Sequence, residues 1–145
     1  MAKTPWAKFS LPGDGSAYAC GDSREFRHTL RKVFGPLVEW VPSLPTGRHA
    51  WLMIEVQSEG SLPALFRDLE RRLTPSGSLW VVLPKKTFAA ATGFPFSWSD
   101  VQQAGRSAGL VDNKIAAFSL RLTSIRFVIP LARRASAEAT AREKR

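Results

Sequence analysis

The sequence predicts a three-layer α/β fold, in which helices cover both faces of a mostly parallel sheet of about six strands ending in an antiparallel hairpin. Short apolar runs of strand length alternate with amphipathic helical stretches along most of the 145 residues. The last two predicted strands have no helix between them, so we expect the final strand to run antiparallel to its neighbour. The chain length suits one domain.

The first elements are predicted from apolar spacing and from the positions of glycine and proline. Residues 1–15 form a loop-like arm, in which Trp6 and Phe9 are expected to pack onto the body of the domain. Residues 16–20 are predicted to be a short buried strand between glycines. The helix that follows has one apolar face and ends at a glycine–proline pair. That face consists of Phe26, Leu30, Val33 and Phe34.

The middle of the chain predicts two central strands and an amphipathic helix between them. Residues 49–56 and 79–84 are continuous apolar runs, which suit strands covered on both faces. Residues 37–41 are a further strand candidate, ended by Pro42. The helix is expected to begin at Ser61. Its apolar stripe consists of Leu62, Leu65, Phe66, Leu69 and Leu73.

The C-terminal part predicts a helix and the closing hairpin. Residues 85–98, "KKTFAAATGFPFSW", are expected to be a loop, and Gly109 is expected to end the helix after it. Residues 110–120 and 125–130 are then predicted to be strands, with a turn near residues 122–124.

Capping residues locate the start of two of these helices. Asp22 or Ser23 is expected to cap the first helix, and Asp22 with Glu25 has the spacing of a capping box. Ser99 and Gln102 have the same spacing at the start of the last helix.

The alternation of strands and helices predicts one Rossmann-like domain over residues 16–131, with right-handed crossovers between parallel strands. A parallel sheet that ends in an antiparallel hairpin is similar to the methyltransferase variant of the Rossmann-like fold, in reduced form. Residues 132–145 are rich in alanine and charge and lack an apolar stripe, so we expect a basic, disordered tail.

Two motifs carry a resemblance to a known family. The stretch "GSLWVVLPKK" at residues 77–86 is followed by "AGLVDNK" at residues 108–114. In this order they resemble the LWVxxPKK and AGLVDxK motifs of a small bacterial family described as a domain of unknown function. The resemblance spans residues 65–128 and implies a small Rossmann-like fold without an assigned activity. Residues 119–122 depart from the family pattern, so any site that the family builds there is in doubt.

The usual cofactor contacts of a Rossmann-like fold are missing from the sequence. The turn after the first strand offers Gly21 as its one glycine, and Glu39 stands too early to be the ribose-binding acid of the second strand. We therefore expect no S-adenosylmethionine or NAD cofactor and no catalytic residues. The sequence predicts a non-catalytic binding or interaction module, with a protein partner or a second copy of the chain as its partner.

The alternative is a basic pocket at the carboxyl ends of the strands, where open α/β sheets bind ligands. It would hold an anionic small ligand or nucleic acid. The candidate ligand-binding residues are Gly21, Asp22, Ser23, Lys85, Lys86 and Thr87.

The net charge of +9, from 21 lysines and arginines against 12 acidic residues, attracts anions without choosing among them. The candidate polyanion contacts lie off the apolar face of the first helix: Arg24, Arg27, Arg31 and Lys32. No nucleic-acid-binding motif accompanies them, so nucleic acid is not the favoured partner.

Cysteine, histidine and hydropathy exclude other classes of site. The single cysteine, Cys20, excludes an internal disulfide framework and a multi-cysteine zinc site. The two histidines, His28 and His49, lack the spacing of metal ligands, so no metal is expected. No apolar run approaches the ~20 residues of a membrane span. We expect a cytoplasmic protein that does not bind membranes.

Overall fold

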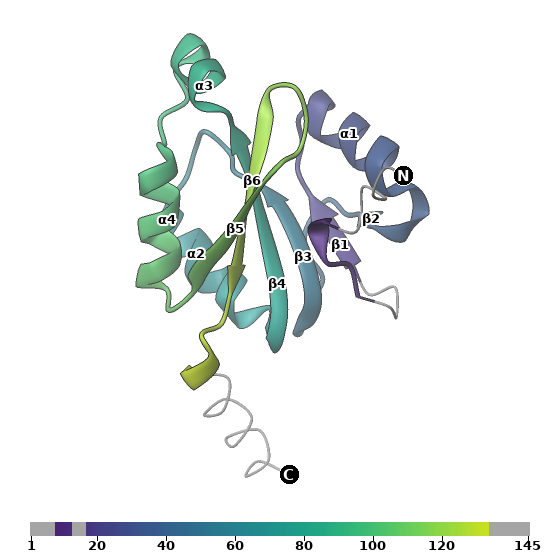
Figure 1. The fold of residues 1–145 in the computed structure, drawn as a ribbon, viewed down its shortest axis with the longest axis vertical. Coiled ribbons are helices and arrows are strands. Elements are labelled where there is room, and N and C mark those ends of the chain that lie inside the picture. Colours follow the sequence, from purple (N-terminus) through teal and green to yellow (C-terminus); the bar gives the residue numbers. More distant parts are fainter. Residues whose placement is uncertain (1–7, 13–16, 134–145) are drawn as a thin grey trace.

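The structure is a computed structural model that describes residues 8–12 and 17–133. It confirms an α/β fold with one six-stranded mixed sheet (Figure 1). The strands are β1 (Ala17–Cys20), β2 (Glu39–Trp40), β3 (His49–Glu55), β4 (Leu73–Pro84), β5 (Val111–Ala117) and β6 (Leu122–Val128). The helices are α1 (Arg24–Phe34), the short 3-10 helix η2 (Gly35–Leu37), α2 (Leu62–Arg71), α3 (Lys86–Thr92) and α4 (Trp98–Ser107).

The strand order is β2-β1-β3-β4-β6-β5, with the first four strands parallel. The predicted antiparallel hairpin is present, and its second strand, β6, also pairs antiparallel with β4. The burial of the two strands explains why β6 lies between β4 and β5. Almost every residue of β6 is buried, whereas most of β5 is exposed, so β6 takes the interior position and β5 forms the edge.

Alternation of side chains along the central strands builds a core on each face of the sheet. Trp51 and Met53 of β3 and Trp80 of β4 pack on the side of α1. Leu52 of β3 and Val81 of β4 point to the opposite side, where they meet α2 and α4. Each central strand is therefore buried on both faces, which explains its continuous apolar run, as the sequence predicted.

Phe9 ties the N-terminal segment into the α1-side core, as predicted. Its ring is buried and lies 5.2 Å from the Phe34 ring and 4.9 Å from the Trp80 ring. Its carbonyl oxygen accepts hydrogen bonds from two buried indoles, Trp51 Nε1 at 2.7 Å and Trp80 Nε1 at 2.9 Å. Both indoles are thereby satisfied away from water. Trp6 and residues 134–145 of the expected tail lie outside the described residues.

Three boundaries differ from the sequence prediction. The segment expected to be a loop contains α3, because its alanine-rich run favours a helix and Gly93 closes that helix with a φ of 71°. Strand β4 begins at Leu73, which pairs with His49 of β3, and an irregularity in the register separates this pair from the Trp51–Ser78 pair. The predicted turn at residues 122–124 lies inside β6. The chain instead reverses before Leu122, whose amide donates to Ser119 Oγ at 3.1 Å.

The helix caps also differ in part. Ser23 caps α1 and accepts a hydrogen bond from the Phe26 amide at 3.1 Å, but Asp22 and Glu25 form no capping box. The Glu25 carboxylate instead accepts from the Ser119 hydroxyl, across the domain. Helix α4 has its capping box at Ser97 and Asp100, which lie two residues before the predicted pair. Gly109 ends α4 with a φ of 91°, as expected.

The close packing of Gly105 in α4 against Phe127 in β6 leads to a prediction about stability. A β-carbon at Gly105 would overlap the Phe127 ring. Gly105→Ala should therefore lower the free energy of unfolding by about 1–2 kcal/mol, because the overpacking cost exceeds the helix-propensity gain of alanine. Urea unfolding measures this change. The control is Gln103→Ala on the exposed face of α4, and a Gly105→Ala protein as stable as that control would contradict the packing.

Candidate functional site

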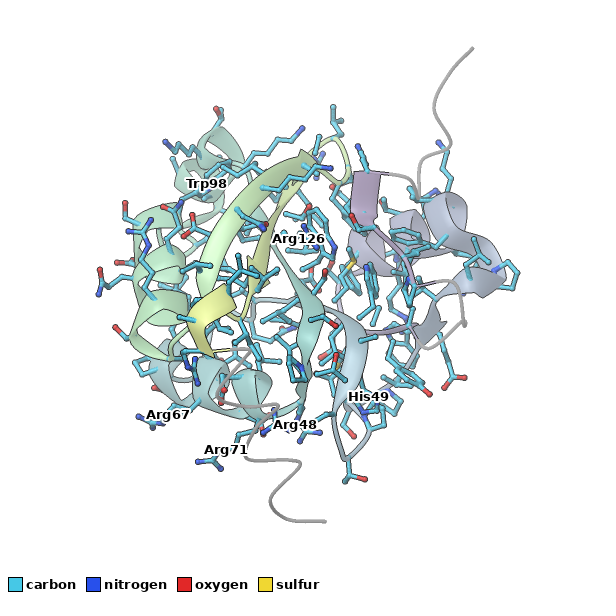
Figure 2. The ribbon with its side chains drawn as sticks, turned by 60° about the horizontal axis from the view of Figure 1, so that its bottom comes forward. Arg48, His49, Arg67, Arg71, Trp98 and Arg126 are labelled. Carbon is cyan, nitrogen blue, oxygen red and sulfur yellow. The ribbon has the colours of Figure 1, made fainter. Side chains whose placement is uncertain are left out.

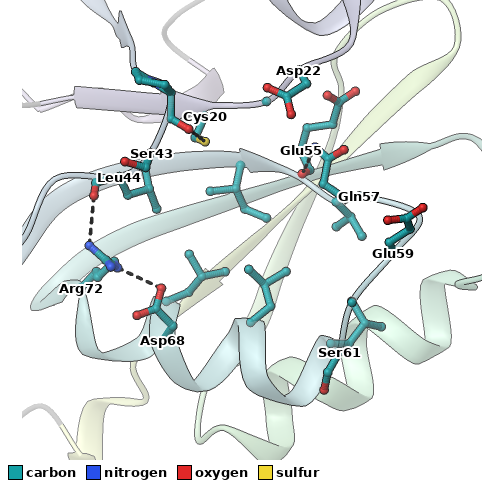
Figure 3. Close-up of a pocket in the computed structure, with 18 of the residues that line it drawn as sticks. Cys20, Asp22, Ser43, Leu44, Glu55, Gln57, Glu59, Ser61, Asp68 and Arg72 are labelled. Atoms are coloured by element: carbon teal, nitrogen blue, oxygen red, sulfur yellow. Dashed lines mark hydrogen bonds and ion pairs between the residues drawn. The ribbon is translucent and has the colours of Figure 1, made fainter.

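A pocket of about 660 Å³ opens at the carboxyl ends of β1 and β3 (Figure 3). Its walls are these strand ends, the loop between β2 and β3, and one side of α2. That loop contains Pro42, Pro45 and Gly47, which disfavour a helix. The Cys20 thiol lies 3.5 Å from the Pro42 carbonyl oxygen, so the loop crosses over the end of β1. The pocket thus forms where a loop, and not a helix, lies over the sheet.

Arg72 fixes the wall of the pocket that the loop and α2 form together. Its guanidinium donates to Asp68 Oδ2 at 3.0 Å, one helical turn earlier. It also donates to the carbonyl oxygens of Leu44 at 3.2 Å and Pro45 at 2.8 Å. The ion pair with Asp68 therefore offsets the charge of Arg72, and two carbonyl oxygens accept further hydrogen bonds from its guanidinium.

Glu55 occupies the N-terminus of α1 with its carboxylate. The Ser23 amide donates to Glu55 Oε1 at 3.0 Å, and the Ser23 hydroxyl donates to Oε2 at 2.5 Å. A helix N-terminus stabilises negative charge through its free amides and its dipole. The protein thus supplies its own anion at the place where the sequence predicted that a ligand anion would bind.

Gly21 allows this approach between β1, β3 and α1. A β-carbon at this position would lie 2.6 Å from the Phe26 ring and 2.7 Å from Cβ of Glu55. The Gly21 carbonyl oxygen also accepts a hydrogen bond from Trp40 Nε1 at 2.8 Å. The single glycine of the first turn therefore serves contact between protein segments, which is a different role from the close approach to a cofactor that glycines have in Rossmann-like turns.

The pocket lining is acidic. Among the described residues that line it, the carboxylates of Asp22, Glu55, Glu59 and Asp68 stand against the one guanidinium of Arg72. Figure 3 shows Asp22, Glu55 and Glu59 toward one end and Asp68 beside Arg72 at the other. The expected basic pocket is thus not found at the ends of β1 and β3. A net-basic chain carries here a site suited to positive charge.

Cys20 also faces this acidic environment. Burial raises the pKa of its thiol, and the negative charges of Asp22 and Glu55 raise that pKa further. Since each effect disfavours the thiolate, the thiol stays protonated at neutral pH. Cys20 therefore acts as a weakly polar wall of the pocket and lacks the lowered pKa of a nucleophilic cysteine.

The structure separates the two halves of the predicted ligand site. Gly21 and Asp22 line the pocket, and Ser23 is bound to Glu55 beside it. Lys85, Lys86 and Thr87 do not line it. They lie at the start of α3, where Lys85 is the N-cap residue and its amide donates to the Arg121 carbonyl oxygen at 2.8 Å.

The acids that line the pocket from β3, from the loop after it and from α2 were not predicted from the sequence: Glu55, Glu59 and Asp68. Glu55 could have been recognised from the sequence as a candidate site residue, because it lies at the carboxyl end of a strongly predicted strand. Glu59 and Asp68 line the pocket because α2 packs beside that strand end, and no short sequence motif predicts this packing.

The basic side chains predicted to contact a polyanion lie outside this pocket. A hollow of about 370 Å³ on the surface of α1 is lined by Asp22, Arg24, Arg27, His28 and Arg31. The Arg27 guanidinium stacks 4.2 Å from the Trp40 ring, and Lys32 is exposed. Figure 2 shows another group, Arg48, Arg67 and Arg71, at the end of the molecule opposite Trp98. Polyanion contact through the α1 arginines and Lys32 stays a prediction.

Residues 8–12 and 17–133 contain no group of three or more histidine, cysteine or acidic side chains placed to hold a metal ion. None of the helices in these ranges combines the length and apolar character that a membrane span requires.

Comparison with known proteins identifies the fold. No family model and no curated protein matches the sequence. A SAM-dependent methyltransferase from Aquifex aeolicus is 11% identical, with a TM-score of 0.61 over 86% of this chain and 87% of that one. The fold is methyltransferase-like. A TehB-like SAM-dependent methyltransferase from Corynebacterium glutamicum has a similar fold, with 8% identity and a TM-score of 0.55 over 88% of this chain and 87% of the other.

Other solved structures match over part of their own length. LepI in complex with SAM has a TM-score of 0.57 and 9% identity, and the match covers 87% of this chain but 46% of LepI. Sequence identities this low show a common fold and leave activity open.

The residues present fit S-adenosylmethionine, the cofactor that the fold implies, only in part. This molecule carries a carboxylate, yet Glu55 holds the N-terminus of α1 and Arg72 is bound to Asp68. The end of β2 presents Trp40, whose indole donates to Gly21, where a ribose would require a carboxylate. The acidic lining suits the ammonium and sulfonium charges of this molecule, whereas the end of β2 offers no acid for its ribose and the one lining guanidinium is paired with Asp68.

The contact between Glu55 and the N-terminus of α1 leads to a second prediction about stability. Glu55→Gln removes the negative charge while retaining an oxygen that can accept from Ser23. We expect the free energy of unfolding to fall by about 1 kcal/mol, since the charge-assisted cap and its interaction with the helix dipole are lost. Urea unfolding at low salt measures the change. The control is Glu59→Gln, whose carboxylate caps no helix, and equal stability of the two variants would contradict this role of Glu55.

Proposed function

We propose that this chain is a non-catalytic ligand-binding module with a methyltransferase-like fold, and that its acidic pocket binds a small organic cation. One observation carries the proposal. The pocket holds four carboxylates, and the guanidinium that lines it is already bound to Asp68 and to two carbonyl oxygens. A cation entering the pocket would meet uncompensated negative charge, whereas an anion would meet repulsion.

The apolar walls narrow the class of cation. Between the acidic groups, the pocket is lined by aliphatic and aromatic side chains: Leu44, Ile54, Val56, Leu62, Leu65 and Phe96. Such walls favour a ligand that buries hydrocarbon while its charged ends meet carboxylates. An aliphatic diamine has both properties. A metal cation would gain nothing from these walls.

The side chains of the pocket support a binding role over catalysis. The Cys20 thiol has a raised pKa and so is a poor nucleophile at neutral pH. The Glu55 and Asp68 carboxylates are engaged by Ser23 and Arg72. The lining of this pocket contains no histidine to act as a general base.

A role in protein interaction has separate support. Val111 and Ile115 expose apolar side chains on the edge strand β5, and Leu120 is exposed in the following turn. Exposed apolar groups beside a free strand edge are compatible with contact to a protein partner or to a second copy of the chain.

Calorimetric titration with ligands of one length and different charge tests the cation pocket. The probes are 1,8-diaminooctane, the neutral 1,8-octanediol and octanedioate. We expect the diamine to bind, with an affinity at least about tenfold higher than that of the diol, because a buried charged hydrogen bond contributes roughly 1.5–3 kcal/mol. We expect no binding of octanedioate at the pocket.

Variants locate the binding. The double variant Asp22→Asn/Glu59→Gln should weaken diamine binding, while Glu39→Gln, an acid of the exposed strand β2 outside the pocket, should not. Diamine binding that is insensitive to the double variant, or tighter binding of octanedioate, would refute the cation pocket. Methyl transfer from S-adenosylmethionine to any acceptor would refute the non-catalytic role.

A further inference from the structure

A second pocket, of about 600 Å³, lies on the other side of Phe96 from the acidic pocket. It is enclosed by α3, by the segment that connects α3 to α4, and by the first turn of α4. In Figure 1 these elements stand at one end of the molecule, beyond the carboxyl end of β4. We call it the aromatic pocket, because Phe94, Phe96 and Trp98 contribute its rings.

These three rings are half-buried and fixed in orientation. The Phe94 and Phe96 rings meet edge to face, with centroids 5.9 Å apart. The Trp98 indole lies over the end of β4 and donates to the Pro84 carbonyl oxygen at 3.4 Å. All three also pack against the core on the α2/α4 side. Half-exposed rings held by the core form a preorganised surface on which a planar ligand can stack.

Lys86 supplies positive charge to the same pocket. Its ammonium lies 5.4 Å from the centre of the Trp98 ring, which orients it over the aromatic wall. The ion pairs of the described residues join other side chains, and none involves Lys86. The Asp100 carboxylate at the rim is engaged differently, because it accepts from the Ser97 amide at 2.8 Å in the α4 capping box.

We infer that the aromatic pocket binds a planar aromatic anion, such as an aromatic carboxylate. The rings of Phe94, Phe96 and Trp98 would take the flat apolar part of the ligand. The Lys86 ammonium would pair with the carboxylate and donate to it. The inference assigns a binding role to Lys86 alone of the two adjacent lysines, since Lys85 does not line this pocket.

The two pockets have separate chemistry. Of these two pockets, Asp22 and Glu59 line only the acidic one, and Lys86 and Phe94 line only the aromatic one. Variants of one pair therefore leave the charges of the other pocket in place. Loss of cation binding and loss of aromatic-anion binding are distinguishable results, so either proposal can fail without the other.

The test uses a matched pair of ligands, indole-3-carboxylate and the neutral indole-3-carboxamide, titrated into the ¹⁵N-labelled full chain. We expect saturable binding of the carboxylate and a shift of the Trp98 indole N–H resonance. The indoles of Trp51 and Trp80, which are buried in the α1-side core, should not shift. The carboxamide should bind about tenfold more weakly, because it lacks the charge that pairs with Lys86.

Matched variants then assign the residues. Lys86→Gln should lower carboxylate affinity about tenfold and bring it to that of the carboxamide, whereas Lys85→Gln should leave both affinities unchanged. Phe94→Ala should weaken both ligands, since it removes part of the stacking surface and leaves Lys86 in place. Absence of carboxylate binding, equal affinity of the two ligands for the wild-type protein, or equal effects of the two lysine variants would overturn the inference.

Discussion

The carboxylate of Glu55 at the N-terminus of α1 is the contact on which the functional end of this molecule depends. It joins the end of β3 to the first turn of α1 through the amide and hydroxyl of Ser23. The approach requires Gly21, because a β-carbon there would collide with Phe26 and with Glu55 itself. A helix N-terminus that would otherwise attract a ligand anion is thereby neutralised by the protein. The same carboxylate raises the pKa of the Cys20 thiol and contributes to the negative charge of the pocket.

Most of the fold could be predicted from the sequence, because it rests on patterns within short segments. Apolar runs predicted the central strands, and an apolar stripe predicted α2. The absence of a helix between the last two strands predicted the hairpin. The alanine-rich run of α3 was mistaken for a loop, since proline and glycine beside it suggested a break. The candidate site was harder to predict because it depends on the pairing of separate segments. Glu55 reaches Ser23 since Cys20 and Ile54 are partners in the β1–β3 register, which no local pattern specifies.

The net charge of the chain does not describe the lining of its acidic pocket. A chain with a net charge of +9 suggests an anion-binding site, yet the arginines of α1 line a separate hollow, and Arg72, which does line the acidic pocket, is paired with Asp68. Figure 2 shows Arg48 and Arg71 at the end opposite Trp98. Lys85 and Lys86 follow a strand end as expected, but α3 turns Lys86 toward the aromatic rings of the neighbouring pocket. Our two proposals therefore place opposite ligand charges on either side of Phe96, each set by a few side chains nearby and not by the overall charge.

The central claim, that Glu55 itself fills the anion position of α1, is tested most directly by a sulfate titration followed by NMR. The amide resonance of Ser23 would be recorded in the wild-type protein and in Glu55→Ala as sulfate is added at constant ionic strength. We expect no saturable shift of the Ser23 amide in the wild-type protein and a saturable shift in the variant, where the amide is free. A saturable shift in the wild-type protein, of the size seen in the variant, would show that Glu55 does not fill this position.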